Sequence, residues 1–328
     1  MTTLSRRTVS ATLASLLAAP ALGGRALAQS WPNRPVTIIV PFPAGASTDV
    51  LARLVAEKLR QELGQGFVVE NKVGAGGNIA AGGVVRAAPD GYTLFLSSSG
   101  PLSSNKLLYK TLTYDPLSDF EPISLVGDVQ CVVASHPSVP ARTFAELVAY
   151  GKANPGKLTF GSPGYGLMGH IVGELLQRTA GFQMTHVPYR GSAPLANDLL
   201  AGNVNVAVDF LPPYIPHIQT GSIRGLAVSA DKRATQVPDV PTLAEAGLTG
   251  MNVSAWYGLA GPKGMPQDVV KRLSSIVNAY VTSAEVAAKL DQIGVRPIGG
   301  GPDDLRKAQA GEITRWEPII RGAGIALE

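Results

Sequence analysis

The stretch VTIIVPFPAGASTDVLARLVAEKL, residues 36–59, contains in one run the three parts from which the rest of the chain is built. Its first five residues are all β-branched and predict a strand, and the Pro- and Gly-containing segment after them predicts a loop. From Ser47 onward the apolar residues recur at helical spacing, with Leu51, Val55 and Leu59 on one face. This succession of strand, loop and helix is the repeating unit of an α/β fold.

Similar units recur along the chain in two sets. In the first set, strands are predicted at 36–40, 67–69 and 92–96, with a helix over 78–88. A long extended segment at 120–135 follows. The second set then comprises helices at 143–153, 170–176 and 194–200 and strands at 158–160, 184–187, 204–210 and 225–229. This alternation predicts mostly parallel, doubly wound sheets.

The two sets predict two similar lobes, for which 328 residues are sufficient. Three later helices, near 267–282, 284–293 and 302–321, are expected to cover the first lobe. The chain then crosses between the lobes near 126–132 and 227–232, which predicts a hinge of two crossovers. The expected division is lobe 1 at 29–128 plus 230–328, and lobe 2 at 129–229.

The first 28 residues have the features of a signal peptide. Arg6 and Arg7 precede an uncharged Ala/Leu-rich run over 8–24, and the Ala-Leu-Ala of 26–28 predicts cleavage near Ala28. The paired arginines are compatible with twin-arginine export as well as with the Sec pathway. No later stretch reaches about 18 consecutive apolar residues, so a soluble periplasmic chain is expected after cleavage.

The basic surplus of the chain belongs mostly to this leader. The full sequence has 28 Lys and Arg against 24 Asp and Glu. Three of the arginines and none of the acids lie in residues 1–28, which leaves a net charge of +1. The longest charged cluster is Asp231-Lys232-Arg233 and aromatic residues are only 6%, so nucleic-acid binding is not expected.

Two loops are candidates for holding an anion, because each leads from a predicted strand into the start of a predicted helix. Helix starts present unpaired backbone N–H groups and a partial positive charge, which bind anions without Arg or Lys. The loops are Ala44 to Thr48 and Ser162 to Leu167. The plain alternative is that Ser47 and Ser162 only cap their helices. Because the loops would lie at matching sheet edges, we favour an anionic small molecule held between them.

Other polar residues fit the same cleft less directly. Asn78 follows the Gly-rich segment 74–77 and either caps the next helix or points its amide at a ligand. Ser98 lies in a polar segment expected at the cleft edge. Asp209 ends an apolar strand, where it either faces the cleft or caps the following turn. The GxGxxG pattern is incomplete because Ile79 stands at its last position, so no dinucleotide site is expected.

Catalytic and metal sites have little support. The four histidines are scattered, and His170 with Glu174 is expected to be a local pair, or His170 to line the cleft, rather than a metal-ligand set. No GxSxG motif occurs, and Cys131 lies in an apolar run typical of a buried side chain. No metal and no cofactor are expected. An exported hydrolase or transferase that uses Ser162 and His170 remains as a minor alternative.

Several sequence blocks together resemble the periplasmic substrate-binding proteins of tripartite tricarboxylate transporters, the Bug or TctC-like family. The similarity runs from Trp31 to Glu328. The blocks that carry it, in order, are residues 31–36, 40–45 with Asp49, 69–72, 74–78, 88–94, 161–164 with His170, 187–191 and 238–247.

The resemblance implies a two-lobed periplasmic-binding-protein fold of type II, the Venus flytrap. It implies capture of a small carboxylate and its delivery to the permease subunits of the transporter, by a protein that is not an enzyme and is expected to be a monomer. The carboxylate would be held by main-chain groups and small hydroxyls of two loops, often through water, rather than by an Arg clamp. The matching residues are Phe42, Ala44, Gly45, Ala46 and Ser47, then Ser162, Pro163, Gly166 and His170, with Asn78 and Asp209 as looser matches.

Two departures from the family pattern bear on the ligand. Ala44-Gly45-Ala46 replaces the commoner Pro-Gly-Gly, and Leu167-Met168 stands where many members have a small hydroxyl residue. Both changes make the expected pocket more apolar, which favours a less polar or aromatic carboxylate over citrate. A periplasmic sensor that presents the same ligand to a receptor kinase is the alternative to a transport role.

Overall fold

The computed structural model describes residues 31–251 and 253–323. The predicted signal peptide, residues 1–28, lies outside the described residues and stays a prediction. The fold is that of the compact unit Arg34–Glu328. In the described part of the chain, no helix combines the length and the apolar character that crossing a bilayer requires.

Within residues 31–251 and 253–323, ten strands join in a mixed sheet. They are β1 (Val36–Val40), β2 (Phe67–Asn71), β3 (Thr93–Ser98), β4 (Phe120–Ser135), β5 (Thr159–Ser162), β6 (Thr185–Pro188), β7 (Val206–Phe210), β8 (Arg224–Val228), β9 (Ser254–Pro262) and β10 (Val295–Pro297). Their order is β2-β1-β3-β9-β4-β7-β5-β6, and β8 and β10 also pair with β4.

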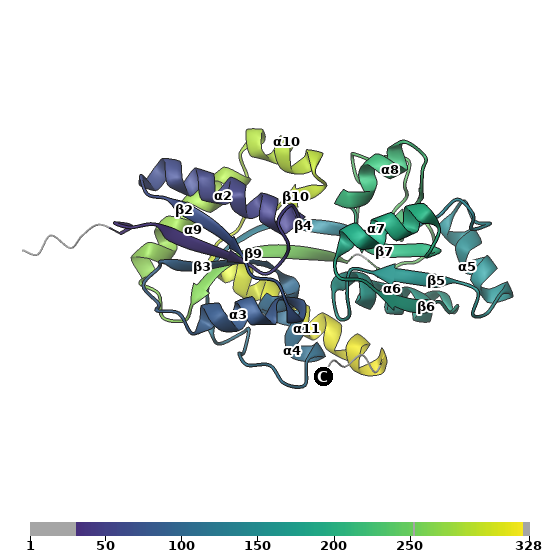
Figure 1. Cartoon of the computed structure of the whole chain (residues 1–328), viewed down its shortest axis with the longest axis horizontal. Coiled ribbons are helices and arrows are strands. Elements are labelled where there is room, and N and C mark those ends of the chain that lie inside the picture. The colour runs from purple at the N-terminus through teal and green to yellow at the C-terminus, as the bar shows by residue number, and fades with distance from the viewer. Residues whose placement is uncertain (1–30, 252, 324–328) are drawn as a thin grey trace, which may run out of the picture. The chain divides into compact units, whose positions relative to one another are not determined.

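Strand β4 divides the sheet into two groups (Figure 1). Its residues 120–130 pair with β9, which in turn pairs with β3, and we call β1, β2, β3, β9 and β10 the first strand group. From Cys131 onward β4 pairs with β7 and β8, and we call β5, β6, β7 and β8 the second strand group. This confirms an α/β architecture in two parts.

Strand direction differs between the outer and the central parts of the sheet. Strand β1 is parallel to β2 and β3, and β5 is parallel to β6 and β7, as the sequence predicts. All pairings that involve β4 or β9 are antiparallel. The sequence predicts no strand in the region of β9, because the Gly and Pro residues there weaken the local pattern. Its partners β3 and β4 lie more than a hundred residues earlier in the chain. The sheet is therefore mixed rather than mostly parallel.

Ten helices of the described residues flank these strands. They are α2 (Ser47–Leu63), α3 (Asn78–Val85), α4 (Asn105–Leu108), α5 (Phe144–Ala153), α6 (Met168–Ala180), α7 (Ser192–Ala201), α8 (Ile215–Gln219), α9 (Gln267–Val281), α10 (Ala284–Gln292) and α11 (Pro302–Ala323). Short turns η1 (Ala75–Gly77), η2 (Gly100–Ser104) and η3 (Pro212–Tyr214) precede α3, α4 and α8. Helix α2 buries Leu51, Val55 and Leu59, the face that the sequence predicts.

Each strand group has its own apolar core. In the first, Phe95 stacks on Phe120 with ring centroids 5.5 Å apart, and Leu305 of α11 packs into the same cluster. In the second, Val132 of β4, Leu195 of α7 and Tyr214 form the centre of the cluster. Burial of these large side chains is what holds the helices against the sheet.

Two segments of the chain connect the strand groups, at the points where strand pairing passes from one group to the other. One is β4 at Gln130–Cys131, and the other is the segment between β8 and β9. Ser229 links them, since its hydroxyl accepts from the Cys131 N–H at 3.0 Å and donates to the Val253 carbonyl at 2.5 Å. Ala234 and Val240 pack in the second core, beyond the expected crossing at 227–232. The lobe boundaries at 128/129 and 229/230 stay a prediction, and these contacts favour a later second boundary.

Candidate ligand-binding site

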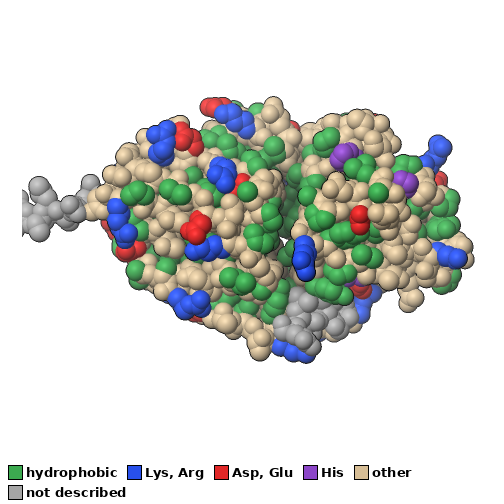
Figure 2. All heavy atoms as spheres, in the orientation of Figure 1, with side chains coloured by type: hydrophobic (Ala, Val, Ile, Leu, Met, Phe, Trp, Pro, Cys, Tyr) green, Lys and Arg blue, Asp and Glu red, His purple; other side chains and the backbone are tan. Residues whose placement is uncertain are grey.

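A cavity of about 750 Å³ is lined by residues from both strand groups. Figure 2 shows the surface hollowed between the groups, with hydrophobic side chains along the hollow. From the first group come Phe42, Pro43, Ala44, Gly45, Ala46, Ser47, Thr48, Val50, Ser98 and Tyr257. From the second come Pro163, Leu167, Arg190, Gly191, Ser192, Ala193, Pro194, Phe210, Pro212, Pro213, Ile215 and Pro216. Gln292 and Ile293, at the end of the helix that packs on β10, complete the lining. None of the lining residues is acidic.

The loop between β1 and α2 forms one wall with its backbone. Gly45 has φ +84°, the left-handed conformation that glycine adopts at little cost, and this turns the chain into the helix. Helix α2 then begins at Ser47, and its N-cap residue Ala46 provides no side-chain cap. The Ser47 hydroxyl lies 2.8 Å from the Tyr257 hydroxyl of β9, which fixes its position on the wall. The first N–H groups of a helix lack partners within it, so this wall suits an anion.

Asp49 braces this loop from behind. Its carboxylate accepts from the Gly45 N–H at 2.9 Å, from the Arg53 guanidinium at 3.0 Å and from the Asn71 amide at 3.0 Å. The same Asn71 amide donates to the Phe42 carbonyl at 2.9 Å. Burial raises the pKa of Asp49, but hydrogen bonds from Arg53, Gly45 and Asn71 outweigh it and hold that pKa below its usual range. The loop is thus rigidly attached to α2 and β2.

The loop between β5 and α6 directs its polar side chains inward. Ser162 is fully buried, and its hydroxyl lies 2.7 Å from Nε2 of His186. His170 accepts from the Gly166 N–H at 3.1 Å through Nδ1, and its ring stacks on His186 with centroids 4.1 Å apart. Burial lowers the pKa of His170 to about 4, and burial together with His170 lowers that of His186 to about 3. Both rings are therefore neutral near pH 7.

The geometry around Ser162 does not bring together Ser162 and His170, the pair that the hydrolase alternative requires. Ser162 is bonded to His186 rather than to His170, and it does not line the cavity. The His186 Nδ1 atom is buried without a hydrogen-bond partner, so no carboxylate orients this ring among the described residues. A lowered pKa also makes His186 a poor base.

The sequence predicts that the start of α6 forms the cavity wall opposite the first loop. In the structure, the start of α7 forms most of this wall. Pro163 and Leu167 are the lining residues from 162–167, whereas 190–194 line it continuously. Backbone bonds from Tyr189 N–H to Ser162 O and from Gly191 N–H to Pro163 O hold the two loops together. The sequence could have predicted this wall, since residues 187–192 also lead from a strand through a loop into a helix.

Asp209 lies beneath this wall rather than on it. It is fully buried and accepts from the Phe210 N–H at 2.7 Å, the Tyr214 hydroxyl at 2.9 Å and the Ser192 hydroxyl at 3.0 Å. Burial raises its pKa to about 7 despite these bonds. Asp209 thus positions Ser192, which does line the cavity, instead of facing the cleft itself.

The predicted site residues therefore fall into two sets. Those that line the cavity are Phe42, Ala44, Gly45, Ala46, Ser47, Ser98 and Pro163, and those that do not are Asn78, Ser162, Gly166, His170 and Asp209. Asn78 accepts from the Asn105 amide at 2.6 Å and the Tyr114 hydroxyl at 3.0 Å, so its oxygen is already bonded. A ligand-contact role for any of these residues stays a prediction.

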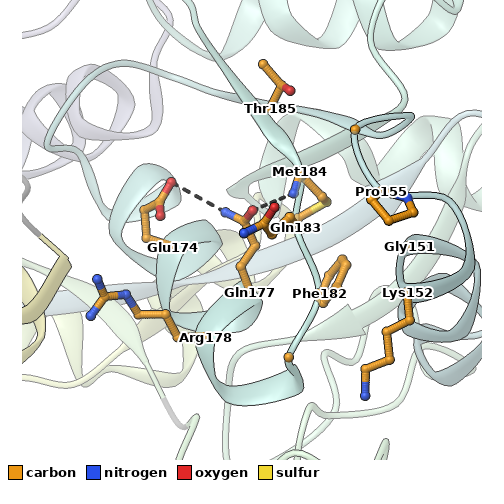
Figure 3. Close-up of a pocket in the computed structure, with 12 residues that line it drawn as sticks. Gly151, Lys152, Pro155, Glu174, Gln177, Arg178, Phe182, Gln183, Met184 and Thr185 are labelled. Carbon is orange, nitrogen blue, oxygen red and sulfur yellow. Dashed lines mark hydrogen bonds between the residues drawn. The ribbon is translucent and has the colours of Figure 1, made fainter.

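A second cavity, of about 710 Å³, lies against α5 and α6 (Figure 3). Gln177 donates to Glu174 at 3.4 Å and accepts from the Met184 N–H at 2.5 Å. In Figure 3 the side chains of Lys152 and Arg178 point away from one another. Because its polar groups bond to one another and its cations do not converge, we place the ligand site in the first cavity. Among the described residues, no group of three or more His, Cys, Asp or Glu side chains could hold a metal.

The structure has two strand groups joined by two connections. Between them lies a cavity with helix starts in its walls and no acidic residue in its lining. These features define a two-lobed solute-binding protein. A family model for the tripartite tricarboxylate transporter family receptor (TctC) matches residues 51–325. The chain belongs to this family, which consists of solute-binding receptors rather than enzymes.

Individual relatives agree with this assignment. Protein BugT of Bordetella pertussis is 38% identical over 302 residues, which cover 92% of this chain and 93% of BugT. The solved structure of R. palustris Rpa4515 with adipate has a TM-score of 0.86 at 39% identity, over 90% of this chain and 100% of that one. MatC (Rpa3494) from Rhodopseudomonas palustris with bound malate has a TM-score of 0.80 at 32% identity, over 88% and 100%.

Proposed function

We propose that this chain is an extracytoplasmic solute-binding protein that captures a small carboxylate in the 750 Å³ cavity and delivers it to the permease of a tripartite tricarboxylate transporter. The observation that carries the proposal is the first loop, Phe42–Thr48, whose backbone and Ser47 hydroxyl form a wall without any acidic neighbour in the lining. Such a wall favours an anion through N–H groups and the helix dipole.

The relatives support a carboxylate in particular. Rpa4515 and MatC were solved with adipate and malate, and both resemble this chain over nearly its whole length. The rest of the lining is largely apolar, with Leu167, Phe210 and Ile215 among its residues. A ligand with a carboxylate and an apolar body matches such a lining better than a densely charged acid such as citrate.

Capture would proceed by closure of the two strand groups on the ligand. Contacts to the first loop come from one group and contacts to the start of α7 from the other, so a ligand that touches both stabilises the closed form. The connections at Cys131 and Ser229 are where such a motion would be absorbed. We further infer export through the leader, cleavage near Ala28 and a monomeric protein in the periplasm.

The proposal is tested by titrating the purified protein with straight-chain C4 to C8 dicarboxylates, aromatic acids, nicotinate and the monocarboxylates of matched length. At least one carboxylate should raise the melting temperature and bind in calorimetry with a micromolar or lower Kd, with no turnover of the ligand. Flat melting curves across the panel, or binding of neutral analogues as tightly as the acids, would overturn it. Transport of the bound acid by membranes that contain the permease tests delivery.

A further inference from the structure

Arg190 is the one charged side chain among the residues that line the 750 Å³ cavity. It lies in the turn between β6 and α7 and is exposed to solvent. Its place in the backbone is fixed, because the Tyr189 N–H donates to the Ser162 carbonyl at 3.0 Å and the Gly191 N–H to the Pro163 carbonyl at 2.9 Å. The guanidinium is therefore attached to a rigid turn rather than to a loose loop.

The guanidinium of Arg190 has no hydrogen bond or ion pair with any residue in the described part of the chain. The nearby acids are already bonded: Asp198 accepts from the Tyr189 hydroxyl at 2.8 Å, and Asp209 accepts from Ser192, Phe210 and Tyr214. A free guanidinium offers a planar fork of N–H donors that fits a carboxylate with two parallel bonds. Arg190 thus retains its full capacity to bind an anion at the cavity.

The position of Arg190 relative to the first loop matters as much as its charge. Ser47 and the start of α2 belong to the first strand group, whereas Arg190 belongs to the second. The surface between them is largely apolar, with Pro163, Leu167 and Phe210. A ligand that satisfies both ends would carry one anionic group at each end of an apolar body.

We propose that Arg190 is the specificity-determining residue of the cavity, binding the second carboxylate of a dicarboxylate whose first carboxylate lies at the Phe42–Thr48 loop. This rests on the proposed function, since it assumes that the cavity binds a carboxylate at all. The consequence is a preference for dicarboxylates with an apolar spacer over monocarboxylates of the same chain length.

The test compares matched acids, such as hexanedioate and hexanoate, on the wild type and on Arg190→Gln and Arg190→Lys. In the wild type the diacid should bind more tightly than the monoacid. Arg190→Gln should weaken diacid binding about 10- to 100-fold, the effect of losing a charge-assisted hydrogen bond, and change monoacid binding by less than about threefold. Arg190→Lys should recover part of the loss, because it retains the charge without the fork.

Arg142→Gln is the matched control. Arg142 is also exposed and lies beside the second strand group, but it does not line the cavity, so its loss removes the same charge at another place. Equal weakening of diacid by Arg142→Gln and Arg190→Gln, or equal weakening of diacid and monoacid by Arg190→Gln, would overturn the role of Arg190 while leaving carboxylate binding intact. Failure of the wild type to bind any acid of the panel would overturn the proposed function and this inference together.

Discussion

The loops that follow β1 and β5 consist of similar residues but use their polar groups in different directions. The first presents Ser47 at the start of α2, beside Tyr257 and on the wall of the cavity. The second ends β5 with Ser162, which is fully buried and bonded to His186. Ser47 thus lies at the cavity, whereas Ser162 is enclosed by its own neighbours, although Pro163 and Leu167 of its loop line the cavity.

The difference follows from where each serine lies relative to its strand. Ser47 is the first residue of a helix, beyond the end of β1, so its hydroxyl is free to face the cavity. Ser162 is the last residue of β5, which has β6 on one side and β7 on the other. The neighbouring strand brings His186 within hydrogen-bond distance. A hydroxyl enclosed and bonded in this way contributes to the stability of the fold.

The same substitution in both loops should have opposite effects, and this is the largest difference that we expect. Ser47→Glu places a carboxylate at the first turn of α2, where the helix tolerates it, so the protein stays folded. Repulsion of the ligand carboxylate should weaken binding at least about 100-fold. Ser162→Glu instead buries a carboxylate with no cation beside it and should lower the free energy of unfolding by several kcal/mol.

Calorimetric titration and urea unfolding of both variants separate the two effects. Ser222→Glu, on an exposed turn outside the cavity, is the control for the added charge and should leave binding and stability nearly unchanged. If Ser162→Glu folded with wild-type stability and lost only binding, the two loops would be equivalent after all.

The histidine pair should make the stability of the second loop sensitive to pH between about 6.5 and 4. His170 has a folded-state pKa of about 4, against about 6.5 in an unfolded chain. The stability from keeping this ring neutral is complete above about pH 6.5 and is lost as the pH falls toward 4, by about 3 kcal/mol in all. His170→Asn retains an acceptor for the Gly166 N–H but does not titrate.

Urea unfolding of both proteins between pH 7 and pH 4 measures this contribution. The stability gap between wild type and His170→Asn should narrow steadily below pH 6.5. A gap that stays constant down to pH 4 would mean that burial does not hold the imidazole neutral.

The smallest expected effect concerns the turn of the first loop. A Cβ at Gly45 would meet no atom within 4 Å, so the cost of Gly45→Ala comes from its φ of +84° alone. We expect a loss of roughly 1 kcal/mol in the free energy of unfolding and weaker binding through the shifted backbone. Gly83→Ala, inside α3 and also without contacts, should instead stabilise by up to about 1 kcal/mol. Melting temperatures that shift in the same direction for Gly45→Ala and Gly83→Ala would contradict the view that backbone conformation decides the sign of the effect.

Strands and helices were predictable from the sequence where neighbouring residues alone determine them. Strand β1 has the predicted bounds, and α5 follows Thr143, whose hydroxyl accepts from the Glu146 N–H at 3.2 Å as an N-cap should. The nine-residue strand β9 was missed because its Gly and Pro residues weaken the local pattern, and pairing with β3 and β4 overrides that weakness. The first loop was predicted correctly as a wall of the cavity because the sequence shows a helix start directly after a strand, and this helix start is uncapped in the structure.

The sequence by itself determined the α/β class, the family and the first wall of the site, because periodicity, loop composition and ordered motifs are local properties. It could not show that the helix start facing the first loop is that of α7, or that Arg190 lines the cavity there without a partner among the described residues. Only the tertiary structure decided which of the two similar loops has its serine at the cavity. The reason is that the direction of a side chain at a strand end depends on its neighbours in the sheet, and those neighbours are distant in sequence.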